Sequence, residues 1–150
     1  MNQPAGGLRF PAYHTHLGRP VKLLPTPDGG LAMWDYDEET GGWEPANHLV
    51  DEVLFAVGGE VSGPMSKDRF IQKVEAERAR YVEGEGPIFA LYETIRAIED
   101  ASDEEGRDLT PTESALIAGL RRKTYAMFEA ELVRRGDPGA DVEAAREAGQ

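Results

Sequence analysis

The chain of 150 residues contains no cysteine, only three histidines and far fewer basic than acidic residues. The absence of cysteine excludes disulfides, thiol nucleophiles and the common cysteine-ligated zinc sites. With 16 basic against 28 acidic residues, the formal charge is -12, which opposes binding to nucleic acid and to anionic membranes. The composition therefore predicts neither a nucleic-acid partner nor a membrane partner.

Long hydrophobic runs are also missing. No segment approaches the roughly 18 consecutive apolar residues that cross a bilayer, and the first residues lack the basic and apolar regions of a secretory signal. The length fits one domain, since domains usually have roughly 100 to 150 residues. We therefore expect a single cytoplasmic domain over residues 1–150.

The first 45 residues have the pattern of short strands joined by turns. Apolar residues flank a proline- and glycine-rich turn at 25–30, which indicates a β-hairpin. A second glycine-containing turn, at 37–42, leads to another strand at Trp43. We expect an antiparallel meander of two to four strands over 1–45. Because so small a sheet is not stable alone, helices should cover one of its faces.

Residues 46–135 carry apolar side chains at helical spacing, broken by glycines. This pattern predicts four helices: 47–57 capped by Asn47, one from Ser66 to Tyr81, one from Pro87 to about Ser102, and one capped by Thr110 that ends near Arg135. Residues 136–150 contain one branched apolar residue, Val142, and predict a flexible tail or a frayed helix. The predicted fold class is α+β, a small N-terminal antiparallel β-meander packed against about four α-helices.

The negative charge is concentrated in one part of the chain. Residues 84–109 hold eight acidic and two basic residues, beside a net-basic helix. Two interpretations remain open: the acidic stretch neutralises that helix, or it forms a negative patch that docks a basic partner protein. The candidate partner-binding residues in this stretch are Glu99, Asp100, Asp103, Glu104, Glu105 and Asp108.

Aromatic residues supply a second candidate surface. Trp34, Tyr36 and Trp43 are expected to lie close together across the turn at 37–42, as cross-strand aromatic pairs do. We include them among the candidate partner-binding residues. Phe55 and Phe89 fall off the apolar faces of their helices and indicate a second packing surface or a partner site. The alternative for all five aromatic residues is burial in a wider interface with the meander.

A metal site is the main catalytic alternative. His14 and His16 are two residues apart, so both point to the same face of a strand and could reach one metal ion. His48 or an acidic residue would complete the site and activate a water molecule. No third ligand has a diagnostic spacing, so the alternative interpretation is that these histidines lie on a half-exposed strand or loop and bind no metal.

Motifs for other chemistry are missing. The glycine pairs form no phosphate-binding loop, no serine lies in Gly-x-Ser-x-Gly, and the acidic stretch does not match a calcium-binding EF-hand loop. We therefore expect no cofactor, and a non-enzymatic acidic domain of inhibitor or immunity type that docks a basic protein. A small metal-dependent hydrolase using His14 and His16 and a subunit that assembles through its helices are the alternatives.

Overall fold

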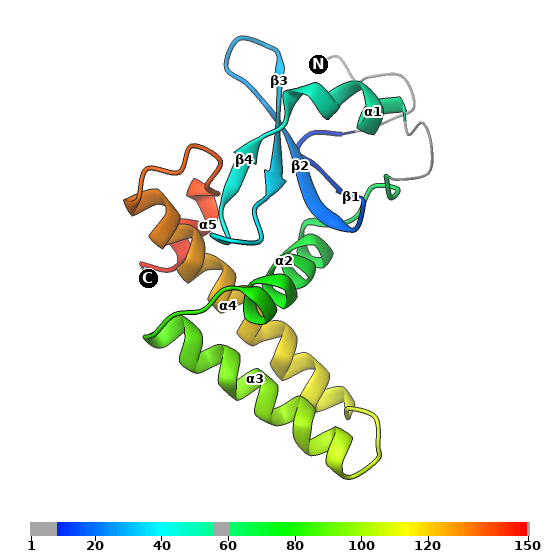
Figure 1. Cartoon of the computed structure of the whole chain (residues 1–150), viewed down its shortest axis with the longest axis vertical. Helices are drawn as coiled ribbons and strands as arrows, with labels where there is room; N and C mark the ends of the chain where they lie inside the picture. The colour runs from blue at the N-terminus through cyan, green and yellow to red at the C-terminus, as the bar shows by residue number, and fades with distance from the viewer. Residues whose placement is uncertain (1–8, 56–60, 150) are drawn as a thin grey trace.

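The computed structural model describes residues 9–55 and 61–149 and has an α+β fold, with the strands first and the helices after them (Figure 1). Its elements are β1 (Ala12–His16), β2 (Arg19–Pro25), β3 (Leu31–Tyr36), β4 (Trp43–Pro45), the 3-10 helix η1 (Asn47–Leu49), α1 (Val50–Phe55), α2 (Lys67–Tyr81), α3 (Pro87–Glu104), α4 (Pro111–Arg134) and α5 (Val142–Glu147).

The four strands form one antiparallel sheet in the order β1-β2-β3-β4, which confirms the predicted meander. Val21 on β2 lies opposite both His14 on β1 and Asp35 on β3, so the side chains of these three residues are on the same face of the sheet. The face that includes Val21 packs its apolar residues against η1 and α1, where Val53 is buried.

The opposite face of the sheet packs against α2, α4 and α5. Tyr13 and Trp43 project from this face onto Phe70 of α2, and the Trp43 and Phe70 rings stack with centroids 5.8 Å apart. Phe128 of α4 and Ala144 of α5 belong to the same core. Helices therefore cover both faces of the sheet, whereas the sequence led us to expect cover on one.

Asn47 does not cap a helix, so the predicted helix start at this residue is wrong. Its side-chain oxygen accepts a hydrogen bond of 2.8 Å from the backbone N–H of Met33. The chain then forms one 3-10 turn before α1 begins at Val50. Asn47 thus ties the end of the sheet to η1, and the predicted helix end at Gly58-Gly59 lies outside the described residues.

The other three helix starts are confirmed. Ser66 accepts a hydrogen bond from the backbone of Arg69, and α3 begins at Pro87. Thr110 and Glu113 form the predicted capping box, each side chain bonding the other's backbone N–H. Leu116, which the helical spacing places on the buried face of α4, is half exposed.

The chain beyond α4 is an ordered part of the core, contrary to the expected flexible or frayed tail. Asp141 caps α5 by accepting a hydrogen bond from Ala144, and its backbone N–H donates to Glu129 of α4 at 2.8 Å. Lys67 of α2 forms an ion pair of 2.9 Å with the Asp141 carboxylate. Two helices, α2 and α4, therefore hold the C-terminal segment in place.

Burial of the α3 face gives a first testable prediction. Ile95 is buried, so we expect Ile95→Ala to lower the free energy of unfolding by about 2 to 3 kcal/mol, the lower part of the usual range for such cavities. The loss is moderated because Ile95 also borders a shallow pocket between α2, α3 and α4, into which neighbours can relax. Chemical denaturation measures the change.

The matched control is Arg122→Ala on α4. Arg122 is exposed and pairs with Asp68 at 2.6 Å, and surface ion pairs contribute little. We expect a change below about 0.5 kcal/mol. Equal losses for the Ile95 and Arg122 variants would contradict the assignment of the helical faces.

Candidate functional site

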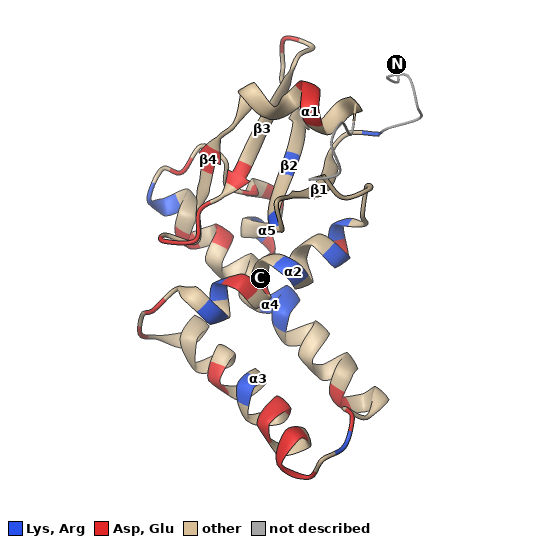
Figure 2. Ribbon diagram, turned by 45° about the vertical axis from the view of Figure 1, so that its right-hand side comes forward, with Lys and Arg blue, Asp and Glu red and all other residues tan. Residues whose placement is uncertain are grey.

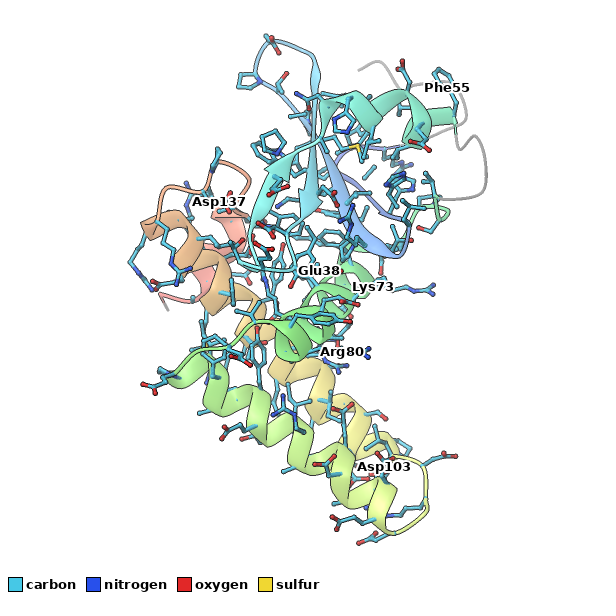
Figure 3. The ribbon with its side chains drawn as sticks, in the orientation of Figure 1. Glu38, Phe55, Lys73, Arg80, Asp103 and Asp137 are labelled. Atoms are coloured by element: carbon cyan, nitrogen blue, oxygen red, sulfur yellow. The ribbon has the colours of Figure 1, made fainter. Side chains whose placement is uncertain are left out.

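The acidic candidates lie together at the far end of a helical hairpin. α3 and α4 run antiparallel and project away from the sheet (Figure 1), and acidic residues occupy the end of α3 and much of its connection to α4 (red in Figure 2). Asp103 lies near this end (Figure 3). We call the six predicted residues the acidic tip: Glu99, Asp100, Asp103, Glu104, Glu105 and Asp108.

Two carboxylates of the acidic tip have a basic neighbour. Arg107 pairs with Glu105 and, at 2.8 Å, with Glu113, whose pKa the hydrogen bonds from Arg107 lower to about 2. Glu99 lies 3.8 Å from Arg121 of α4. Part of the charge therefore neutralises basic residues nearby, as one interpretation of the sequence expected.

The other four carboxylates have no ion pair with any described residue: Asp100, Asp103, Glu104 and Asp108. All four residues are exposed. The acidic tip is thus a surface of solvated negative charge on the protruding end of the molecule.

For three of these acids, Asp100, Asp103 and Glu104, the position is unfavourable for α3, the helix that carries them. The C-terminal end of a helix has a partial negative charge, and the last turn of α3 contains no basic residue. Asp100 also lies three and four residues from Asp103 and Glu104, the spacing at which like charges repel by about 0.2 to 0.5 kcal/mol per pair. The acidic tip therefore does not serve the stability of α3.

The aromatic candidates do not form a surface. Tyr36 and Trp43 are 2 % and 5 % exposed and belong to the core between the sheet and the helices. Trp34 is half-buried and packs on Gly139, where a Cβ atom would lie 2.8 Å from the indole ring. The structure does bring the aromatic residues together as expected, but as part of the core.

The histidine pair lies on the sheet face covered by α1 and is buried, so the expected half-exposed position is wrong. His14 and His16 are 3 % and 7 % exposed; His14 Nδ1 is 2.9 Å from the carbonyl of Ser62, and His16 Nε2 is 3.4 Å from a Glu52 carboxylate oxygen. Their other ring nitrogens have no hydrogen-bond partner among the described residues. Within 9–55 and 61–149, no three histidine, aspartate or glutamate side chains converge on a possible metal position.

A buried ionic cluster lies where α2 and α4 cross under the sheet. Arg78 is fully buried, and its guanidinium bonds to Glu75 at 2.9 Å, to Glu129, and to the Gly41 carbonyl. Burial would lower the pKa of Arg78, but Glu129 and Glu75 hold it above its usual value. Gly41 has a φ of +77°, and a Cβ there would lie 2.6 Å from the Phe128 ring, so glycine permits this approach.

The remaining bonds of the buried cluster join distant segments. The Tyr92 hydroxyl donates to Glu75 at 2.8 Å, and the Trp43 indole N–H donates to Glu129 at 3.1 Å. Because these charged groups are sealed from solvent and hydrogen-bonded, they offer no access to a substrate. The helical spacing of the sequence does not identify either glutamate as buried. The signal for Glu129 is its position among Tyr125, Phe128 and Leu132.

A groove lies beside α5. It has a volume of about 790 Å³ and lies between the α2–α3 connection, the second half of α4 and α5, with the β3–β4 turn at one end. These segments face one another on the left of Figure 1. Phe89, which the sequence placed off the apolar face of α3, lines it. The polar groups of this lining are mainly glutamate and arginine.

Comparison with known proteins gives no family assignment: no family model matches the sequence, and no similar curated protein or solved structure was found. None of the helices in the described ranges has the length and apolar character needed to cross a membrane. The function is therefore inferred from the residues of this chain.

Proposed function

We propose that this protein is a non-enzymatic acidic binding domain, of the inhibitor or immunity type, that docks a basic partner protein through the acidic tip. One observation carries the proposal: four exposed carboxylates without an ion pair in the described chain protrude at the end of the α3–α4 hairpin, and three of them, Asp100, Asp103 and Glu104, oppose the dipole of α3. These carboxylates weaken the helix that carries them, and attraction of a basic partner would account for their presence.

The geometry around the tip suits recognition. The capping box of α4 and the two ion pairs of Arg107 hold the α3–α4 connection in a defined shape, so the carboxylates need little ordering when a partner binds. Their position at the end of a projecting hairpin exposes them to a concave or flat surface. A cluster of lysine and arginine residues on the partner is the complementary surface.

Electrostatic steering would be the main effect of the tip. A concentrated negative field speeds the encounter with a basic partner and rejects acidic ones, and it weakens as salt is added. A binding role also agrees with the sealed state of the buried ionic cluster, in which no charged group can reach a substrate. Neither the hydrolase nor the assembly alternative has a specific observation in its favour.

The test removes charge without touching the ion pairs. We expect the variant Asp100→Asn, Asp103→Asn, Glu104→Gln to associate with the partner captured from source cells about tenfold more slowly at low salt. The difference from the unmodified protein should disappear at high salt. Stopped-flow association measured over a salt series gives both results, and chemical denaturation should show equal or higher stability because unfavourable charges are gone.

The control removes three acids elsewhere: Glu38→Gln, Glu93→Gln, Glu147→Gln. These residues are exposed and carry no ion pair in the described structure, so the net charge changes equally. We expect a much smaller slowing. An unchanged association rate in the tip variant, or an equal slowing in the control, would refute the acidic tip as the docking surface.

A further inference from the structure

The groove beside α5 has an apolar floor. Val82, Phe89 and Met127 contribute to this floor, and Ala145 and Ala148 of α5 close one side. Its volume of about 790 Å³ lies in the range of about 300 to 1,000 Å³ typical of sites that bury a ligand. Water in contact with such a surface is displaced favourably by an apolar group of the right shape.

Negative charge surrounds this apolar floor. Three exposed glutamates line the groove without an ion pair to any described residue: Glu39, Glu83 and Glu85. The lining also contains Arg134 and Arg135, but both lie beside Glu131, which Arg134 hydrogen-bonds and which Arg135 approaches to 3.7 Å. The two arginines share the single carboxylate of Glu131, and four glutamates against two arginines give the lining a net charge of -2.

The groove is formed before anything binds. A Cβ atom on Gly84 would lie 2.6 Å from the Phe89 ring, so the backbone of the α2–α3 connection packs directly on that ring. α5 is fixed on the other side, because its first turn is capped by Asp141 and Ala144 is buried in the core. Binding to such a surface requires little rearrangement.

We propose that the groove binds an apolar segment of a partner protein that carries lysine or arginine on either side of its apolar residues. The apolar side chains would occupy the floor, and the basic residues would lie against Glu39, Glu83 and Glu85. An acidic segment is repelled by the same carboxylates, which gives the groove its selectivity.

This site is separate from the acidic tip and does not rest on it. The groove lies at the beginning of α3 and the acidic tip at its end, and a helix of 18 residues spans about 27 Å. A short peptide in the groove therefore cannot contact the tip. The chain would offer a basic partner two surfaces. The acidic tip would attract it by charge alone, and the groove would also bind its apolar side chains.

The experiment uses a short fluorescein-labelled peptide with leucines on one helical face and lysines flanking them, titrated by anisotropy. We expect Met127→Lys to weaken its binding at least about tenfold, because the new cation lies in the apolar lining. Met127→Leu keeps volume and polarity and should bind within about twofold. Glu83→Gln with Glu85→Gln should weaken binding about fivefold at low salt, and this exposed pair decides the matter if Met127→Lys does not fold.

The triple variant of the acidic tip, Asp100→Asn, Asp103→Asn, Glu104→Gln, separates the two sites and should bind the peptide within about twofold of the unmodified protein. An equal loss in that variant would place the peptide on the tip and overturn the groove proposal. Equal binding of a peptide with glutamate in place of lysine would also overturn it. So would concentration-dependent self-association that Met127→Lys abolishes, since a second copy would then occupy the groove.

Discussion

Arg78→Ala should lower the free energy of unfolding by about 3 to 5 kcal/mol, the largest loss that we expect from a single substitution in this chain. The change leaves the carboxylates of Glu75 and Glu129 buried without their shared cation, and the Gly41 carbonyl without its donors. Burial already raises the pKa of Glu75, so the variant should take up a proton in this cluster at higher pH than the unmodified protein does. Urea denaturation at several pH values measures both effects.

Arg80→Ala is the matched control, because Arg80 lies on the same helix two residues later and is exposed. We expect it to change stability by less than about 0.5 kcal/mol. Arg78→Lys should fall between the two, since an ammonium group keeps the charge but cannot reproduce the planar bonds to both carboxylates. A loss below about 1 kcal/mol for Arg78→Ala would show that the buried cluster does not stabilise the fold.

The sequence was sufficient to predict structural elements that are determined by residues close together in the chain. The turn residues at 25–30 and 37–42 specify the hairpins, and the capping box at Thr110 specifies the start of α4, because each depends on neighbours a few residues apart. The apolar spacing of the third helix places Ile95 on its apolar face, and Ile95 is buried. The acidity of the tip was equally visible, since charge is a property of composition.

Features that depend on distant partners could not be predicted. Asn47 is a residue type that often caps helices. In the structure its side-chain oxygen instead accepts a hydrogen bond from the backbone N–H of Met33 on β3. The segment after Gly136 has little apolar character, and it is ordered because Asp141 bonds to α4 and Lys67 of α2. Leu116 is exposed because the hairpin projects beyond the sheet, which helical spacing alone cannot reveal.

The candidate site shows the same division. Spacing cannot tell which carboxylates of the tip are paired: Arg107 binds Glu105, while Asp103 has no partner in the described chain. The expected proximity of the aromatic residues does not by itself reveal that Trp43 would be buried against α2. The groove is formed by segments more than 100 residues apart, Glu39 and Ala145 among them, and no local pattern indicates it.

The free energy of unfolding should increase as the pH rises from about 8 to 10, because Lys22 loses its proton more readily in the folded protein than in the unfolded chain. Its side chain is buried, donates to the Gly139 carbonyl at 2.6 Å and lies 4.0 Å from the centroid of the Trp43 ring. Burial lowers the pKa of Lys22 from 10.5 to about 8, against the opposing effect of Glu129. In this pH window the folded protein loses the proton while the unfolded chain still holds it, so alkaline pH favours the folded state.

The expected gain is about 3 kcal/mol at most, since each pKa unit corresponds to about 1.4 kcal/mol. Above about pH 10 the effect should reverse, because burial raises the pKa values of Tyr92 and Tyr125 and the unfolded chain ionises its tyrosines first.

Lys22→Met separates the lysine from every other group that titrates in this range. Methionine fills a similar space without a charge, so the variant should show no rise in stability between pH 8 and 10 while keeping the later decline. Urea denaturation of both proteins in the same buffer series gives the difference in slope, which is independent of any constant change that the lost bond to Gly139 causes. Parallel curves for the two proteins would mean that the buried Lys22 keeps its proton to high pH, held by the Gly139 carbonyl, the Trp43 ring and Glu129.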